Sequence, residues 1–120
     1  MKNLVFFYGN FKKGFYNHYL IEDSIFLGSG RTLEPFALFI DRLPYVTKEL
    51  PLIQIKGEVY YVDDATLTDL DLINGHPDLY CRELVEIILD TNSSLIQAWL
   101  YFNPSCKGIL AVSGEYAPEE

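Results

Sequence analysis

The chain has 120 residues, of which 49% are hydrophobic and 22% are charged. This length fits a single domain over residues 1–120, and the apolar fraction excludes a disordered chain because enough surface can be buried to offset the conformational entropy lost on folding. Nine basic against seventeen acidic residues give a net charge of −8, which repels phosphate backbones. We therefore expect no nucleic-acid partner.

The sequence also argues against a membrane or secreted protein. The first apolar run, residues 4–8, is too short and too close to the N-terminus for a signal peptide, and no run approaches the ~20 residues of a membrane helix. Cys81 and Cys106 lack the spacing of metal ligands, so we interpret them as reduced structural thiols. We expect a cytoplasmic protein with no membrane partner, no metal and no cofactor.

The first third of the chain predicts strands around one short helix. Residues 4–8 form a continuous apolar run ended by Gly9, which is typical of a buried strand that stops where the backbone turns tightly. In the loop that follows, we interpret the pair Lys12 and Lys13 as a solvated turn. The other elements expected here are a short helix at residues 17–21 and strands at 25–28 and 36–40, separated by the turn-prone segment 30–35.

The middle third predicts a loop, a central strand and the clearest helix. Residues 43–51 contain two prolines and little periodicity, which indicates a loop, whereas apolar and polar residues alternate over 53–62 as in a strand. Either Asp63 or Asp64 can cap the helix that follows. Its apolar face is formed by Leu67, Leu70 and Ile73, and Gly75 followed by Pro77 ends it.

The last third predicts a hairpin and a loose end. Residues 80–89 and 95–102 are apolar, β-branched and aromatic runs joined by turn formers at 90–94, and residues 116–120 form a polar tail that we expect to be frayed. Many short strands with a single well-defined helix indicate an α+β fold, a small mixed β-barrel with flanking helices.

Several motifs resemble those of the γ-glutamylcyclotransferase-like (AIG2-like) family, most of all its γ-glutamylamine cyclotransferase branch. They lie in the family's order at residues 7–14, 17–18, 30–35, 57–63, 70–82 and 113–116. Each one alone is compatible with many folds, and it is their common order that makes the resemblance specific. The resemblance implies the cyclotransferase-like fold and a cavity in which a γ-glutamyl group is cyclised to 5-oxoproline with release of an amine.

The resemblance also implies which residues form the site. In this reaction the α-amino nitrogen of the substrate attacks its own γ-carbonyl, so the protein supplies a cradle of backbone N–H groups, a fitted pocket and a general acid/base. The expected cradle is Tyr8, Gly9, Asn10 and Phe11, with Asn10 standing where the family has Thr. Tyr80 and Tyr101 are the expected pocket walls, although nine tyrosines in the chain leave plain core packing as an alternative for both.

At the position of the family's catalytic Glu this sequence has Asn74. An amide can hydrogen-bond a substrate but has no proton equilibrium near neutral pH, so it cannot shuttle the proton. His76 is the nearest group of suitable pKa, and Asp71, Asp78 and Glu58 are further carboxylates in the motifs or beside them. Each of these four also has an ordinary structural interpretation.

Three functions remain open at this stage. The first is a cyclotransferase, impaired or working through a displaced base, whose mark is 5-oxoproline production. The second is a catalytically inactive pseudoenzyme that keeps the pocket as a binding module for a small γ-glutamyl ligand. The third is a structural or interaction domain with a vestigial pocket. In each case the sequence leaves the oligomeric state undetermined.

Overall fold

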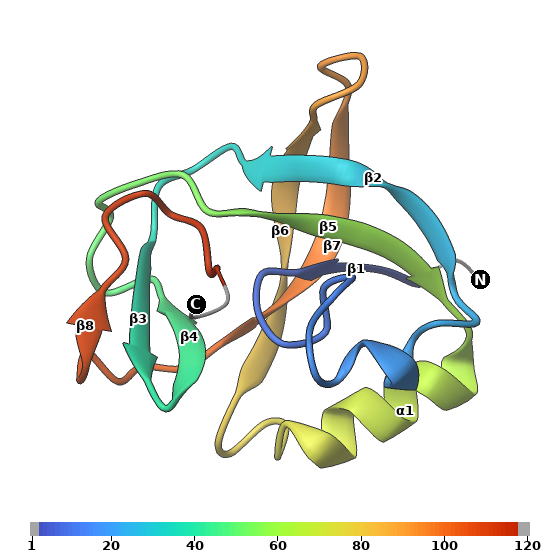
Figure 1. The fold of residues 1–120 in the computed structure, drawn as a ribbon, viewed down its shortest axis with the longest axis horizontal. Coiled ribbons are helices and arrows are strands. Elements are labelled where there is room, and N and C mark those ends of the chain that lie inside the picture. The colour runs from blue at the N-terminus through green and yellow to red at the C-terminus, as the bar shows by residue number, and fades with distance from the viewer. Residues whose placement is uncertain (1–2, 118–120) are drawn as a thin grey trace.

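The computed structural model describes residues 3–117. Figure 1 shows strands wrapped around one another with an α-helix lying across one end. The elements are β1 (Asn3–Phe7), the 3₁₀ helix η1 (His18–Leu20), β2 (Ile25–Thr32), β3 (Ala37–Asp41), β4 (Leu43–Thr47), β5 (Lys56–Val62), α1 (Asp64–Ile73), β6 (Cys81–Leu89), β7 (Leu95–Phe102) and β8 (Ile109–Leu110).

The strands form a mixed barrel, as the sequence predicted. They follow one another in the order β1-β5-β2-β6-β7-β4-β3-β8, and an additional pairing between β1 and β7 closes the first part of this sheet. The closing contact is parallel, at Val5 and Trp99, whereas the pairs that involve β5 are antiparallel. Strands β4, β3 and β8 extend from the barrel on the side of β7.

Strand β1 is buried on both of its faces, which explains its continuous apolar run. Phe6 packs in the main core inside the barrel, whereas Val5 and Phe7 pack in a second core that also contains Leu70 of α1. This alternation follows the period of two residues in a strand. The end of β1 therefore lies between the barrel interior and the helix.

Two segments that the sequence predicted to be irregular are strands. Gly30 belongs to β2, and a Cβ on it would lie 2.6 Å from the backbone oxygen of Ile88, so this glycine permits close approach of β6 and does not form a turn. The first half of the predicted loop 43–51 is β4. Its pairing with β3 through a tight turn at Arg42, where φ is 67°, makes it a strand in spite of its proline.

Lys12 is buried, which makes the prediction of a solvated turn wrong at this position. Its Nζ donates a hydrogen bond of 2.7 Å to the backbone oxygen of Tyr116, and its ammonium lies 5.0 Å from the centroid of the Phe15 ring. Burial lowers the pKa of Lys12, and the carboxylates of Glu115 and Glu58 oppose this shift. Tyr116 is thus packed where a frayed tail was expected, while residues 118–120 of that tail lie outside the described residues.

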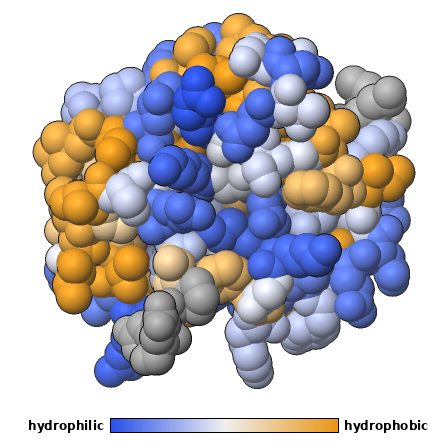
Figure 2. Space-filling model, turned by 45° about the horizontal axis from the view of Figure 1, so that its top comes forward, coloured by the Kyte–Doolittle hydropathy of each residue, from blue (hydrophilic) through white to orange (hydrophobic). Residues whose placement is uncertain are grey.

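The outer surface is uneven in polarity. On the face shown in Figure 2, apolar residues gather at the left, the side on which β3 and β8 lie in Figure 1, and a polar band crosses the middle. Among the described strands, β8 pairs only with β3, and its Ile109 is exposed. Within residues 3–117, no helix is long and apolar enough to cross a membrane.

Candidate functional site

A cavity of about 170 Å³ opens between the end of β1, the start of β4, the end of α1, the segment before β6, and β7. Seven site residues were predicted from the sequence, and all of them line this cavity: Tyr8, Gly9, Asn10, Phe11, Asn74, Tyr80 and Tyr101. They come from three distant parts of the chain. The structure thus brings together residues of two motifs of the resemblance that are distant in sequence, residues 7–14 and 70–82.

The loop after β1 turns its carbonyl groups to the protein. The backbone oxygen of Gly9 accepts from Lys12, and that of Asn10 accepts from the N–H of Asn17 at 3.0 Å. Among residues 3–117, no acceptor is paired with the backbone N–H groups of Gly9, Asn10 and Phe11. Three successive backbone N–H groups beside the cavity are therefore without a protein acceptor among these residues.

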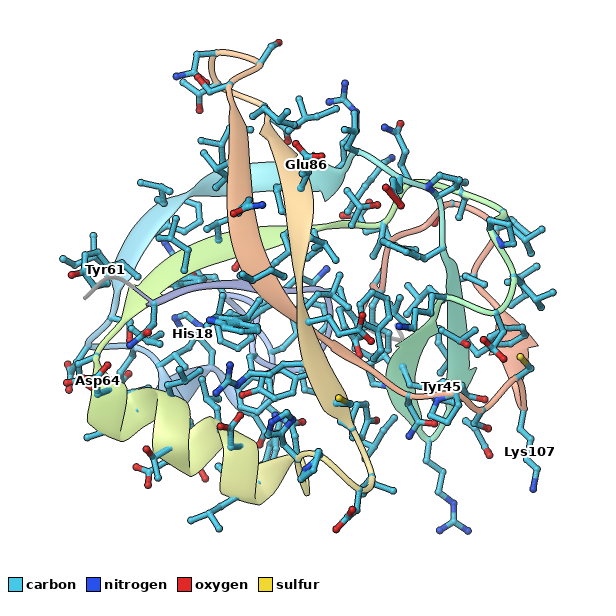
Figure 3. The ribbon with its side chains drawn as sticks, turned by 180° about the vertical axis from the view of Figure 1, so that it is seen from behind. His18, Tyr45, Tyr61, Asp64, Glu86 and Lys107 are labelled. Atoms are coloured by element: carbon cyan, nitrogen blue, oxygen red, sulfur yellow. The ribbon has the colours of Figure 1, made fainter. Side chains whose placement is uncertain are left out.

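Two neighbours hold this loop in place. A Cβ on Gly9 would lie 2.6 Å from Cγ of Pro44, so only glycine fits against β4 at this point. The backbone oxygen of Phe11 lies 2.9 Å from Nδ1 of His18, and because a carbonyl can only accept, Nδ1 is the protonated nitrogen. His18 lies between α1 and the strands of the barrel (Figure 3).

On the other side of the cavity, α1 begins and ends as its sequence predicted. The side chain of Asp63 accepts the N–H of Thr66 at the N-terminus, and Gly75 follows the C-terminus with a φ of 62°. Asn74 is the C-cap residue, directly after Ile73, the last residue of α1. Its location at the end of α1 places it across the cavity from the loop after β1.

The amide of Asn74 is held by its own helix. Its Nδ2 donates to the backbone oxygen of Leu70 at 2.9 Å, and that oxygen also accepts the backbone N–H of Asn74 at 3.0 Å. Because the carbonyl of Leu70 uses one of the two N–H donors of the amide, Oδ1 and the second N–H are left for a ligand. Asn74 therefore offers the cavity an uncharged hydrogen-bond acceptor and one donor.

The three tyrosines of the cavity use their hydroxyl groups inside the protein. Tyr8 donates to the backbone oxygen of Tyr101 at 2.8 Å, Tyr101 donates to Oδ1 of Asp71 at 2.7 Å, and Tyr80 donates to the backbone oxygen of Pro44 at 3.4 Å. Burial raises the pKa of all three, so they are neutral near pH 7. They offer a ligand mainly their ring surfaces.

The carboxylates considered as substitutes for the missing Glu do not line the cavity. Asp71 accepts from Nε of Arg82 at 2.8 Å as well as from Tyr101. Burial alone would raise the pKa of Asp71, but the hydrogen bonds of Arg82 and Tyr101 together with the charge of Arg82 lower it. Glu58 accepts from the N–H of Lys13 at 2.9 Å, and Asp78 is exposed.

His76 does not line the cavity either. Its Nδ1 accepts the backbone N–H of Arg82 at 3.2 Å, and its ring meets that of Tyr101 edge-on at 6.4 Å. The described cavity lining consequently contains three asparagines, aromatic and aliphatic side chains, and no group that titrates near neutral pH. Among residues 3–117 there is also no cluster of three or more His, Cys, Asp or Glu that could hold a metal ion.

Some lining residues had received no role from the sequence. Asn17 is one, and the signal for it was its place in the Asn17–His18 motif. Leu43 at the start of β4, Ile73 at the end of α1 and Leu79 in the segment before β6 are others. The sequence had placed Ile73 on the apolar face of the helix, but the structure leaves it exposed at the cavity. No local pattern distinguishes such residues from ordinary exposed leucines and isoleucines.

The model of the family "Gamma-glutamyl cyclotransferase, AIG2-like" matches residues 5–117. The chain belongs to this family. A Methanocaldococcus jannaschii protein, provisionally named a gamma-glutamylcyclotransferase, is 47% identical to it over 113 residues, which are 93% of each chain. The human gamma-glutamylaminecyclotransferase is 38% identical over 96 residues, which cover 72% of this chain and 62% of the human protein.

Solved structures of AIG2-like proteins share the fold. The crystal structure of an AIG2-like protein from mouse matches with a TM-score of 0.79 and 28% identity, covering 98% of this chain and 80% of the mouse chain. An uncharacterised protein from Pyrococcus horikoshii matches with a TM-score of 0.73 and 27% identity, covering 94% of this chain and 88% of its own. The expected cyclotransferase-like fold is thereby confirmed.

Proposed function

We propose that this AIG2-like cyclotransferase binds γ-glutamyl compounds in the cavity beside Asn74 and cyclises them slowly, releasing 5-oxoproline and an amine. In this reaction the α-amino nitrogen forms a bond to the γ-carbonyl carbon, and the bond from that carbon to the leaving nitrogen breaks. One proton leaves the attacking nitrogen and one is added to the departing amine. The protein itself supplies no nucleophile.

The loop after β1 supports the binding half of the proposal. The N–H groups of Gly9, Asn10 and Phe11 have no partner among the described residues and can hold the α-carboxylate and the oxyanion that develops on the γ-carbonyl. The aromatic walls formed by Tyr80 and Tyr101 restrict the ligand to a folded shape in which nitrogen and carbonyl carbon are close. The family membership of the chain agrees with a ligand of this class.

Asn74 is the reason that we expect slow turnover. Loss of a general base typically costs about 10²–10⁴-fold in rate, while positioning and oxyanion binding still contribute. Asn74 cannot take the proton, and the rest of the described lining does not replace it near neutral pH, because the three tyrosines have raised pKa values. The observation that carries the proposal is therefore a cavity beside three backbone N–H groups without a described acceptor, whose described lining contains no group that titrates near neutral pH.

The same observation favours a second candidate, a binding module without turnover. One experiment separates the two. Purified protein is titrated with γ-glutamyl amides and with 5-oxoproline by calorimetry, and the same mixtures are assayed for 5-oxoproline formation over long incubations. Binding with slow product formation supports the first function, and binding with no product supports the module. If no γ-glutamyl compound and no 5-oxoproline binds, the proposed function is wrong.

A further inference from the structure

The mouth of the cavity is apolar. Most lining side chains are buried or half-buried, and the exposed ones are Leu43, Ile73 and Leu79, with exposed fractions of 55%, 51% and 60%. Single exposed leucines are common on protein surfaces. Here, however, three exposed aliphatic side chains converge on one opening from three parts of the chain: the start of β4, the last residue of α1, and the segment before β6.

Two of these residues lie next to the position of the chemistry. Ile73 directly precedes Asn74, and Leu79 packs on the turn after it, since a Cβ on Gly75 would lie 3.0 Å from Cβ of Leu79. Given the proposed function, the α-carboxylate lies at the loop after β1 and the γ-carbonyl lies near Asn74. The amine part of the ligand then extends past Ile73 and Leu79 to the mouth.

The described lining of the cavity offers a charged amine no carboxylate. No charged side chain is among the described residues that line it, and Asp78, which precedes Leu79, is exposed and outside the lining. An ammonium group on the amine part would lose water at this mouth without gaining a carboxylate partner, which is unfavourable. An apolar group would instead be stabilised by the surface that it and the three aliphatic side chains remove from water.

We propose that the site takes γ-glutamyl amides of uncharged, apolar amines, and that Leu43, Ile73 and Leu79 select them. This inference rests on the proposed function and names the class of its ligand. The three residues act on specificity, through contact with the amine part, and take no part in proton transfer.

The test compares three ligands by calorimetry: the γ-glutamyl amide of phenylethylamine, γ-glutamyl-ε-lysine, and 5-oxoproline, which lacks the amine part. We expect the phenylethyl compound to bind at least about tenfold more tightly than the lysine compound, since small differences of apolar contact in a hydrophobic site are worth roughly 10–200-fold. Comparable affinities for these two would overturn the inference and leave the proposed function intact. Absence of binding by all three would overturn the proposed function itself.

Two variants assign the effect to residues. Leu79→Asp is expected to weaken the binding of the phenylethyl compound and to remove most of its preference over the lysine compound. Leu95→Asp is the matched control, because Leu95 is exposed to a similar extent, 52%, but does not line the cavity. Equal changes of preference in both variants would contradict the assignment to the mouth. Asp78→Asn should leave the preference unchanged. If this variant selectively lost binding of the lysine compound, Asp78 would be shown to recognise that compound, and the inference would be overturned.

Discussion

Two neighbouring regions of the molecule differ in their charge. On α1, Asp71 faces β6 and forms an ion pair with Arg82, whose guanidinium lies 4.2 Å from the centroid of the Trp99 ring. One turn further on, Asn74 faces the cavity with an amide and no charge. The ion pair and the cavity-lining amide thus belong to different positions at the C-terminal end of α1. A change at Asn74 can alter the chemistry while leaving the ion pair in place.

Asn74→Glu tests this separation with the largest expected effect. We expect turnover of γ-glutamyl amides to rise by about 10²–10⁴-fold, because a carboxylate can move the proton that an amide cannot. The oxygen of Leu70 keeps the bond from the backbone N–H of residue 74, so the helix end stays satisfied. The measurement is 5-oxoproline formation. Asn74→Gln, equal in length and unable to exchange a proton, is the control, and an equal gain in both variants would contradict the account.

The pH dependence of Asn74→Glu sharpens the same test. An uncharged cavity at a helix C-terminus disfavours a carboxylate, so the pKa of the new Glu should lie above its ordinary value of about 4.3. A group whose pKa is raised in the folded state stabilises the fold at pH values below its unfolded-state pKa. This stabilisation is lost as the pH rises through the folded-state pKa. Relative to the wild type, the variant should therefore be less stable at pH 8 than at pH 4, and its rate should increase with pH over this interval. Thermal unfolding and rate profiles measure both.

Asp71→Asn tests the other region, the ion pair between Asp71 and Arg82. Removing a charged partner of Arg82 and Tyr101 should lower the free energy of unfolding by about 1.5–3 kcal/mol at pH 7. Because the pKa of Asp71 is lowered in the fold, its stabilisation is present above its unfolded pKa of about 3.9 and is lost as the pH falls through the folded value, so the two proteins should converge in acid. Denaturant unfolding at pH 7 and pH 3 gives the difference.

A matched control for Asp71→Asn is available on the surface. Arg31 and Asp90 form an exposed pair at 3.6 Å, and such pairs contribute about 0–1 kcal/mol. Asp90→Asn should therefore change the free energy of unfolding little and show no comparable convergence in acid. If Asp71→Asn were as mild as Asp90→Asn, the ion pair on α1 would not support the fold.

His76→Ala is expected to be silent when it is combined with Asn74→Glu. His76 lies outside the cavity lining, and its Nδ1 is occupied by the N–H of Arg82. The rate of 5-oxoproline formation by the double variant should match that of Asn74→Glu alone. In the wild-type background, the loss of a measurable activity in His76→Ala would identify this histidine as the proton carrier.

The smallest effect concerns slow deamidation of Asn74, whose product Asp would be a carboxylate one methylene shorter than the family's Glu. The attacking atom would be the backbone nitrogen of Gly75, which donates to the oxygen of Leu72 at 3.2 Å, while the Asn74 amide is bonded to Leu70. These bonds should keep the conversion slow. Peptide mapping by mass spectrometry, with assays of fresh and aged samples, should show trace activity in proportion to the deamidated fraction. Constant activity while that fraction rises would refute this account and make His76 the candidate proton carrier.

The sequence by itself determined the elements whose signals are local. The strand at residues 4–8, the helix from Asp64 with its Asp63 cap and Gly75 end, and the hairpin of β6 and β7 follow from patterns within one segment, because capping and strand alternation act over a few residues. The order of motifs along the chain determined the family, which the family model confirms. The catalytic and binding roles of Asn74 and the cradle residues are still proposals.

Only the tertiary structure decided the features that depend on partners distant in sequence. β4 is a strand because β3 pairs with it, and Gly30 is a strand residue because β6 approaches it. Lys12 can be buried because the carbonyl of Tyr116 accepts a hydrogen bond from its ammonium. The apolar mouth is of the same kind, since its residues come from segments that meet only in the folded chain. Periodicity and spacing report the neighbours of a residue along the chain, whereas burial, close approach and the grouping of side chains around a cavity are fixed by neighbours in space.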